Sequence, residues 1–131
     1  MTGIADTRLL FTLEFPPSPE IKQKTRVFLE KELKTRLLAP TIVLAEFVEI
    51  AGARIGEEAA KNRLRLLKER GMQIVPLDEK HTLVAGSLLL THRNVSTADA
   101  IIASYVKTGA GEYVVTDDSH FKALDVKTKW L

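Results

Sequence analysis

The sequence predicts an α/β fold, a three-layer α/β/α sandwich with a short central parallel sheet. Short apolar segments alternate along the chain with longer amphipathic ones, which is the order of strands and helices in parallel α/β proteins. The segment Tyr113 to Thr116 is a continuous apolar run, as expected of a strand buried on both faces. The length of 131 residues is typical of one domain, so we expect a single domain over residues 1–131.

The first three elements follow from a short apolar pair and a proline-rich break. Ile4-Ala5 is short for a strand, and residues 7–14 behind it read as a helix. The prolines in residues 16–19 end that helix, and Ser18 can cap the next one with a proline at its first position. This second helix is predicted over residues 19–35. Its expected core residues are Ile21, Phe28 and Leu33.

The next three elements are a strand and two helices. Residues 36–40 are predicted to form the strand, and Thr41 to cap a helix over residues 41–53. That helix has apolar spacing at Ile42, Ala45 and Val48/Glu49. A clear helix follows over residues 57–70, ended by Gly71. Its apolar face consists of Ala60, Leu64 and Leu67.

The last part of the chain continues the alternation. Residues 72–76 favour a strand ended by a proline, and Asp78 can cap a helix to about His92. Residues 96–99 resemble a capping sequence before another helix. The buried stripe of that helix is Ala98, Ile101, Ile102, Tyr105 and Val106, and Gly109 and Gly111 stop it. After the strand at 113–116, a short strand near 125–127 is expected to close the sheet.

The composition excludes several kinds of site. There is no cysteine, so disulfides, zinc-thiolate sites, iron–sulfur clusters and thiol nucleophiles are ruled out. The formal net charge of +2 provides no global basic field that binds nucleic acid unaided. Basic residues crowd in 22–36 and 61–70, and their interspersed glutamates indicate solvated helix faces.

The chain is expected to be cytoplasmic and not to enter a membrane. Charged residues in the first fifteen positions interrupt any signal-peptide apolar region. The longest apolar stretch, Leu83 to Leu90, contains Gly86 and Ser87 and is too short to span a bilayer.

Four acidic residues are placed where a parallel fold brings them together. Asp6 and Asp118 follow predicted strands, so both lie at the carboxyl edge of the sheet. Glu46 and Asp99 lie early in helices that leave from, or start at, the same edge. Open α/β sheets bind their ligands along this edge.

Such a cluster indicates a metal ion, because like charges a few ångströms apart disfavour ionisation unless a cation sits among them. Carboxylate oxygens are ligands that Mg²⁺ and Mn²⁺ prefer. A metal held by acids in turn suggests phosphoryl chemistry, with one ion or with two ions about 4 Å apart.

Four segments carry a resemblance to a known family, and together they extend over nearly the whole chain. They are Ile4-Ala5-Asp6-Thr7, Pro40 to Glu46, Ser96 to Ala103, and Val114 to Phe121. In order and spacing, the chain resembles a PIN domain, most of all the small VapC-type toxins of prokaryotic toxin–antitoxin pairs. One departure is Arg8, where the family often has Asn or Ser.

The resemblance implies a Mg²⁺- or Mn²⁺-dependent ribonuclease. Its catalytic and metal-binding acids would be Asp6, Glu46, Asp99 and Asp118, with Asp117 as a neighbour of the last. Asp6 and Asp99 are candidates for direct ligands, while the other two ligate directly or through water and could orient the nucleophile. The resemblance also implies an RNA substrate and a cognate antitoxin protein. A homodimer is expected because so small an enzyme has little surface with which to grip its substrate.

Several neighbouring residues are candidates for supporting roles. The hydroxyls of Thr7, Thr116 and Ser119 lie near the acids in sequence and can fix carboxylate rotamers or act as plain caps. Arg8 can pair with an acid or contact a phosphate.

The histidines and two of the aromatic residues are less informative. His81, His92 and His120 lack the spacing of zinc ligands. His120 can touch RNA or the leaving group, although an exposed turn histidine is favoured. Tyr113 opens a buried strand and Trp130 packs near a terminus, so no base-stacking surface is predicted.

Other interpretations stay open. Taken singly, each Asp could be a helix cap or turn residue, and Glu46 a surface residue. A catalytically weak PIN-like module that binds RNA or protein is the alternative function, favoured only by Arg8. A phosphoacceptor receiver domain is improbable, because the first strand ends in a single acid and the strand at 72–75 ends in Pro76.

Overall fold

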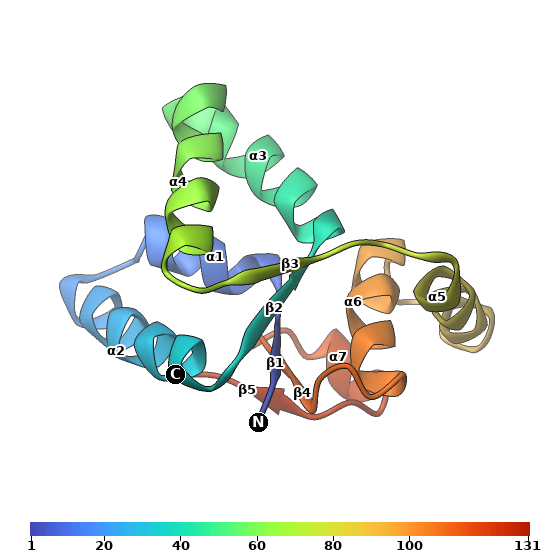
Figure 1. Cartoon of the computed structure of the whole chain (residues 1–131). Coiled ribbons are helices and arrows are strands. Elements are labelled where there is room, and N and C mark those ends of the chain that lie inside the picture. The colour runs from blue at the N-terminus through green and yellow to red at the C-terminus, as the bar shows by residue number, and fades with distance from the viewer.

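The computed structural model describes all 131 residues and has a five-stranded parallel sheet between two groups of helices (Figure 1). The sheet consists of β1 (Gly3–Ala5), β2 (Leu37–Pro40), β3 (Gln73–Val75), β4 (Tyr113–Val115) and β5 (Thr128–Lys129). The helices are α1 (Thr7–Glu14), α2 (Pro19–Thr35), α3 (Thr41–Ile55), α4 (Glu57–Glu69), α5 (Glu79–Thr91), α6 (Thr97–Lys107) and α7 (His120–Ala123). The predicted three-layer α/β/α class is therefore confirmed.

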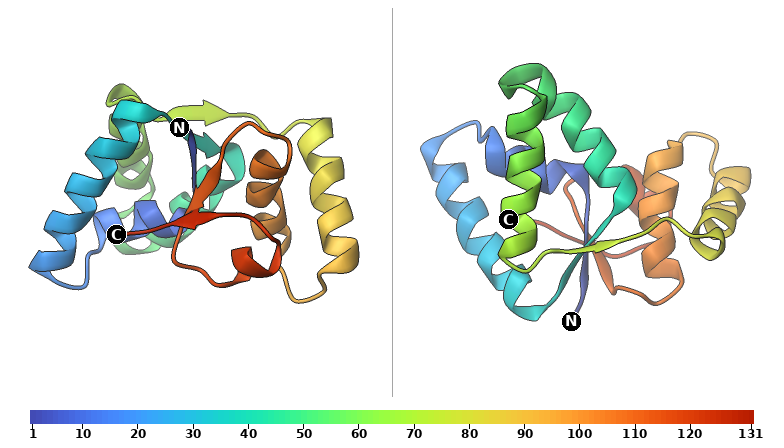
Figure 2. Two further views of the ribbon diagram at one scale, coloured as in Figure 1. Left: turned by 90° about the horizontal axis from the view of Figure 1, so that it is seen from below. Right: turned by 45° about the horizontal axis from the view of Figure 1, so that its top comes forward.

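The strand order is β3-β2-β1-β4-β5, with every neighbouring pair parallel. The chain moves outward from β1 to β3 and then crosses back to β4. Right-handed crossovers place the helices of these two stretches on opposite faces. Figure 2 shows this division, with α1 to α4 on one side of the sheet and α5 to α7 on the other. Flavodoxin-like receiver domains have the order 2-1-3-4-5, so the strand order argues against that alternative.

The central strands are short and completely buried. In β1 and β4 every residue is buried, and Ala5 pairs with Val115 at the end of the two strands. They belong to one core of 28 buried apolar residues that extends into both helix layers. Burial on both faces explains why these strands read as continuous apolar runs in the sequence.

The last strand lies later than predicted, at Thr128–Lys129 instead of residues 125–127. Asp125 has a positive φ of 55° and belongs to a turn after α7, a short helix that the sequence did not predict. The chain therefore reverses direction where the strand was expected, and Lys127 accepts a backbone hydrogen bond from Val114 just before β5 begins.

The buried face of α2 differs from the prediction. The buried residues are Thr25, Leu29 and Glu32, whereas Ile21, Phe28 and Leu33 are half-buried. The two polar residues have partners: the Thr25 hydroxyl donates to the Ile21 carbonyl, and the Glu32 carboxylate accepts from the Tyr113 hydroxyl and the Lys129 ammonium. Polar side chains can be part of a buried stripe when they are paired, which an apolar pattern does not reveal.

The inner face of α3 was also predicted wrongly. Val43, Phe47 and Ala51 are buried, while Ala45 and Glu49 are exposed. Apolar residues occupy most positions of this helix, so its sequence does not single out one face. Thr41 is not the N-cap, which is Pro40; instead the Thr41 hydroxyl accepts a hydrogen bond from the Leu77 amide.

The predicted stripes of α4 and α6 are largely confirmed. Ala60, Leu64 and Leu67 of α4 are buried, and so are Ile101, Ile102 and Tyr105 of α6. No helix combines the length and the apolar content that a bilayer crossing needs.

Candidate active site

The candidate site lies where the strand order reverses, between β1 and β4. Neighbouring connections leave this point toward opposite faces of the sheet, which opens a crevice at the carboxyl ends of the strands. Asp6 directly follows β1, and Asp118 comes three residues after β4. Because Ala5 and Val115 pair at the ends of these strands, the two aspartates enter the crevice side by side.

Two helices bring the other acids to the same crevice. Asp99 lies in the first turn of α6, and Glu46 lies in the second turn of α3. A single cavity of about 290 Å³ is lined by all four acids. Its lining residues are Asp6, Thr7, Arg8, Phe11, Glu46, Ile50, Asp99 and Asp118. The predicted convergence of the acids is therefore found in the structure.

Asp6 is the most buried of the acids, with 4% of its surface exposed. It is the N-cap of α1, and its carboxylate accepts hydrogen bonds from the Thr7 amide at 2.8 Å and the Thr116 hydroxyl at 2.7 Å. The pKa of Asp6 is raised to about 6, mainly by burial and also by the charges of Asp99 and Glu46, while its two hydrogen bonds act in the opposite direction. The fold thus holds Asp6 in place while disfavouring its charge.

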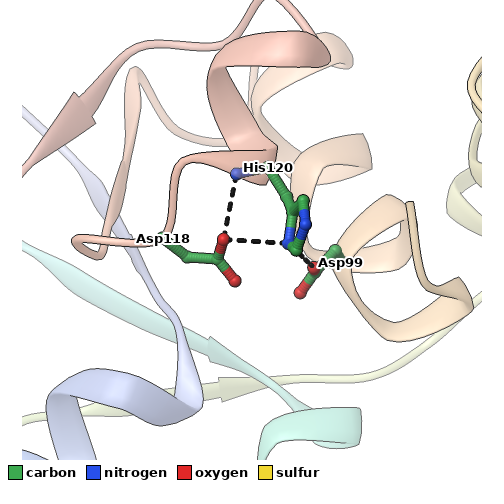
Figure 3. Close-up of side chains that lie close together, drawn as sticks. All are labelled: Asp99, Asp118 and His120. Atoms are coloured by element: carbon green, nitrogen blue, oxygen red, sulfur yellow. Dashed lines mark hydrogen bonds and ion pairs between the residues drawn. The ribbon is translucent and has the colours of Figure 1, made fainter. Parts of the chain in front are cut away.

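Asp99, Asp118 and His120 form a tight group (Figure 3). The His120 Nδ1 atom lies 3.0 Å from Asp118 Oδ1 and 3.8 Å from Asp99 Oδ2. The His120 amide also donates to Asp118 Oδ1 at 2.9 Å. Burial raises the pKa of Asp99, and the nearby charge of Asp118 adds to the increase.

Hydroxyl groups fix the remaining geometry. The Thr7 hydroxyl donates to Glu46 Oε1 at 2.7 Å, which leaves the second oxygen of Glu46 without a protein donor. The Thr116 hydroxyl accepts from the Asp118 amide at 3.0 Å while donating to Asp6. Ser119 is exposed, and its hydroxyl bonds to none of the acids.

Arg8 and Asp117 form a separate pair at the rim. The Arg8 guanidinium binds both carboxylate oxygens of Asp117, at 2.7 and 2.9 Å, and the hydrogen bond from Arg8 lowers the pKa of Asp117. Arg8 itself lines the cavity, and the charges of Asp6 and Asp118 also raise its pKa, although less than Asp117 does.

The donor set fits a hard divalent cation. Four carboxylates face one cavity, and burial, together with their mutual charges, raises the pKa of Asp6 and Asp99, so a cation there would stabilise their charged forms. Asp99, Asp118 and His120 each offer a ligand atom, and these atoms lie within 4.8 Å of one another.

Sequence reasoning underestimated His120 and missed two cavity residues. His120 is exposed, as favoured, but its ring lies against two of the acids. Its position two residues after Asp118 was the signal in the sequence that it lies near the acids. Phe11 and Ile50, which follow Thr7 and Glu46 by one helical turn, line the same cavity and had not been considered.

Comparison with known proteins gives one family and a set of similar structures. Residues 6–127 match the family model of the PIN domain. VapC20 of Mycobacterium tuberculosis, described as a sarcin–ricin loop cleaving toxin, superposes with a TM-score of 0.77 at 16% identity, covering 96% of each chain. A search of the curated proteins returned no match.

Two further structures are complexes bound to DNA. VapBC2 of Rickettsia felis, bound to a promoter fragment, gives a TM-score of 0.76 at 17% identity and covers 100% of this chain and 99% of the other. DNA-bound VapBC of Salmonella typhimurium gives a TM-score of 0.75 at 18% identity and covers 99% of this chain and 98% of the other. At these identities the similarity establishes the fold alone.

Proposed function

The chain belongs to the PIN domain family, and from this premise we propose that it is a Mg²⁺- or Mn²⁺-dependent endoribonuclease of the VapC toxin type. The observation that carries the proposal is the single cavity lined by Asp6, Glu46, Asp99 and Asp118. Four carboxylates at one crevice suit phosphodiester hydrolysis with a divalent cation and suit few other reactions.

The four acids are the proposed metal-binding residues, with Asp6 and Asp99 as direct ligands. A bound divalent cation would supply Lewis acidity, activating water and offsetting charge on the phosphate. Asp6 is suited to a fixed position because two hydrogen bonds hold its carboxylate. The support for Asp99 is its place on the rigid first turn of α6, where the Ser96 cap fixes its backbone.

Glu46 is proposed to orient the attacking water. The Thr7 hydroxyl holds one of its carboxylate oxygens, so the other is available to accept a proton or hydrogen bond from that water. Asp118 faces the same cavity with His120 against it, so an imidazole would lie near a phosphate bound at the acids.

The proposed partners follow from the family and the similar structures. An antitoxin protein is supported by the VapBC complexes among the structural neighbours. RNA as substrate, a homodimer and a cytoplasmic location complete the proposal. The small size of the domain favours a dimer, because a single copy has little surface with which to grip RNA.

Substitution of single acids tests the proposal. Asp99→Asn and Glu46→Gln should each lower Mn²⁺-dependent cleavage of RNA by more than about 100-fold, because loss of outer-shell partners alone costs 10–100-fold. Glu49→Gln is the matched control, since Glu49 lies on the same helix but is exposed and outside the cavity. Gel assays of cleavage, with circular dichroism to verify folding, give the answer. Undiminished cleavage by an Asp6→Asn/Asp99→Asn double variant would reject the mechanism.

A further inference from the structure

An imidazole ring faces two of the acids that line the cavity. The His120 Nδ1 atom lies 3.0 Å from Asp118 Oδ1 and 3.8 Å from Asp99 Oδ2, and Figure 3 shows this edge of the ring turned toward both carboxylates. The side chain of His120 is 57% exposed, so water alone could solvate it. Its direction toward the acids therefore calls for a role other than solvation.

The local backbone holds His120 next to the acids. Its amide donates to Asp118 Oδ1 at 2.9 Å, and the following residue, Phe121, is completely buried in the core. The short helix α7 is thus anchored by one side chain while the preceding one is left at the surface beside Asp118. The anchor limits the positions that the imidazole can take.

No other side chain forms an ion pair with Asp99 or Asp118, and the nearby Arg8 binds Asp117. An imidazole can serve two acids in two ways. When it is protonated, it balances their charge. When it is neutral, Nδ1 can donate its lone pair to a cation that the acids also bind. The first role competes with a metal ion, whereas the second supports it, so the two have opposite effects on metal affinity.

The spacing of the three groups suits coordination of one ion. The ligand atoms of Asp99, Asp118 and His120 lie within 4.8 Å of one another. In an octahedral site with bonds of about 2.1 Å, adjacent ligand atoms lie about 3.0 Å apart and opposite ones about 4.2 Å apart. The separations of 3.0 and 3.8 Å measured from His120 Nδ1 fall in this range. Small side-chain movements would bring all three groups onto one cation.

We propose that His120 Nδ1 is a nitrogen ligand of the cation held by Asp99 and Asp118, an inference that rests on the metal site of the proposed ribonuclease. Mg²⁺ prefers a shell of oxygen atoms, whereas imidazole suits the later first-row transition metals. One nitrogen among oxygen donors shifts the preference of the site away from Mg²⁺ and toward transition metals, least for Mn²⁺ and more for Co²⁺ and Ni²⁺. His120 thereby determines which metal the site takes.

Titration of the metal-free protein with single metals tests the inference without RNA. Isothermal titration calorimetry would compare Co²⁺ and Mg²⁺ binding by the wild type and by His120→Ala, with circular dichroism to verify folding. Loss of the nitrogen ligand should lower Co²⁺ affinity at least about tenfold and Mg²⁺ affinity much less. His120→Asn, which offers an amide oxygen in place of Nδ1, should keep Mg²⁺ binding and still lose the preference for Co²⁺.

Pulsed EPR of the Mn²⁺-loaded protein identifies the ligand directly. An imidazole nitrogen bound to Mn²⁺ gives a ¹⁴N coupling, which should be present in the wild type and absent in His120→Ala. His92→Ala is the matched control, because His92 lies at the end of α5 with its ring against the Leu88 carbonyl rather than an acid. This control should keep the coupling. Asp99→Asn should weaken it, since the ion is placed between Asp99 and the ring.

The outcomes separate the ligand from the proposed activity. Absence of ¹⁴N coupling in the wild type would overturn the inference, and so would a ratio of Co²⁺ to Mg²⁺ affinity that His120→Ala leaves unchanged. Higher affinity of His120→Ala for every metal would also overturn it, because the imidazole would then be a cation that competes with the metal. A wild-type protein that shows the coupling but cleaves no RNA with Mn²⁺ would reject the proposed ribonuclease alone.

Discussion

At the scale of the residue, Thr116 organises the site although it carries no charge. Its hydroxyl donates to Asp6 Oδ2 at 2.7 Å and accepts from the Asp118 amide at 3.0 Å. It is buried and comes directly after β4, so it ties the end of that strand to the acid that follows β1. One hydroxyl therefore fixes the relative positions of two of the acids.

Removing this hydroxyl should weaken metal binding more than it weakens the fold. Thr116→Val keeps the β-branched shape but leaves Asp6 with one donor and the Asp118 amide without its acceptor, so we expect Mn²⁺ affinity to fall about 10–100-fold. Isothermal titration calorimetry measures the change. Thr116→Ser, which keeps the hydroxyl, should bind Mn²⁺ nearly as the wild type does. Equal affinity in the valine and serine variants would show that the hydroxyl does not organise the site.

The positions of the acids were predictable from the sequence, but the directions of most side chains were not. Asp6 and Asp118 could be placed because a residue that follows a parallel strand lies at its carboxyl edge. The pairing of Arg8 with Asp117, rather than with an acid of the cavity, was not predictable. It depends on the bidentate geometry of one ion pair. The order of strands and helices determines at which edge of the sheet a residue lies. It does not determine which group a long, flexible side chain contacts.

At the scale of the element, helix caps hold the catalytic candidates. Ser96 is the N-cap of α6, and its hydroxyl oxygen accepts from the Asp99 amide at 3.1 Å. Ser18 caps α2 in the same way, accepting from the Ile21 amide at 3.1 Å, but far from the cavity. The two serines make equivalent contributions to their helices, yet only one of the helices presents an acid to the site.

This pair allows stability to be separated from function. Ser96→Ala and Ser18→Ala should each lower the free energy of unfolding by about 1 kcal/mol, the usual cost of losing an N-cap. Only Ser96→Ala should also lower cleavage, because the hydrogen bond from Ser96 opposes the raised pKa of Asp99 and fixes the first turn that carries it. Urea denaturation and a cleavage assay make the comparison. A similar loss of cleavage in both variants would assign the effect to stability alone.

Most elements were predicted well, whereas two buried faces, the short helix α7 and the position of one strand were not. The stripe of α6 was predictable because apolar and polar residues alternate there with a helical period. In α2 the buried Glu32 carboxylate accepts hydrogen bonds from Tyr113 of β4 and Lys129 of β5, which are distant in sequence. The short β5 pairs only with β4, so its position depends on the turn at Asp125 rather than on its own residues.

At the scale of the whole molecule, the topology explains why the acids collect at all. Reversal of the strand order between β1 and β4 makes one crevice, and the short strands place acids from four separate segments of the chain in it. Burial, and to a smaller extent the charges of Asp99 and Glu46, raise the pKa of Asp6, so its charged form is disfavoured in the absence of a cation. Keeping this carboxylate charged in the folded state therefore costs stability.

This cost predicts that stability depends on pH in the absence of metal. The pKa of Asp6 is about 6 in the folded protein against an ordinary value of 3.8, so the folded state binds the proton more tightly. The Asp6 contribution to stability is fully present below about pH 4 and is lost as pH rises through about 6, a change of about 3 kcal/mol. Asp99, whose pKa is also raised, acts in the same direction.

Urea denaturation in EDTA at pH 4.5 and 7.5 measures this dependence, with Asp6→Asn as the control that cannot titrate. Relative to that variant, the wild type should lose stability as pH rises, because Asp6 becomes charged in a crowded anionic cavity. Excess Mn²⁺ at pH 7.5 should restore the wild type, since a ligand that binds only the folded state stabilises it. The Asp6→Asn variant should gain less stability from Mn²⁺ than the wild type does. Parallel pH profiles for the two proteins, or equal stabilisation by Mn²⁺, would show that the cavity does not disfavour the charged form of Asp6.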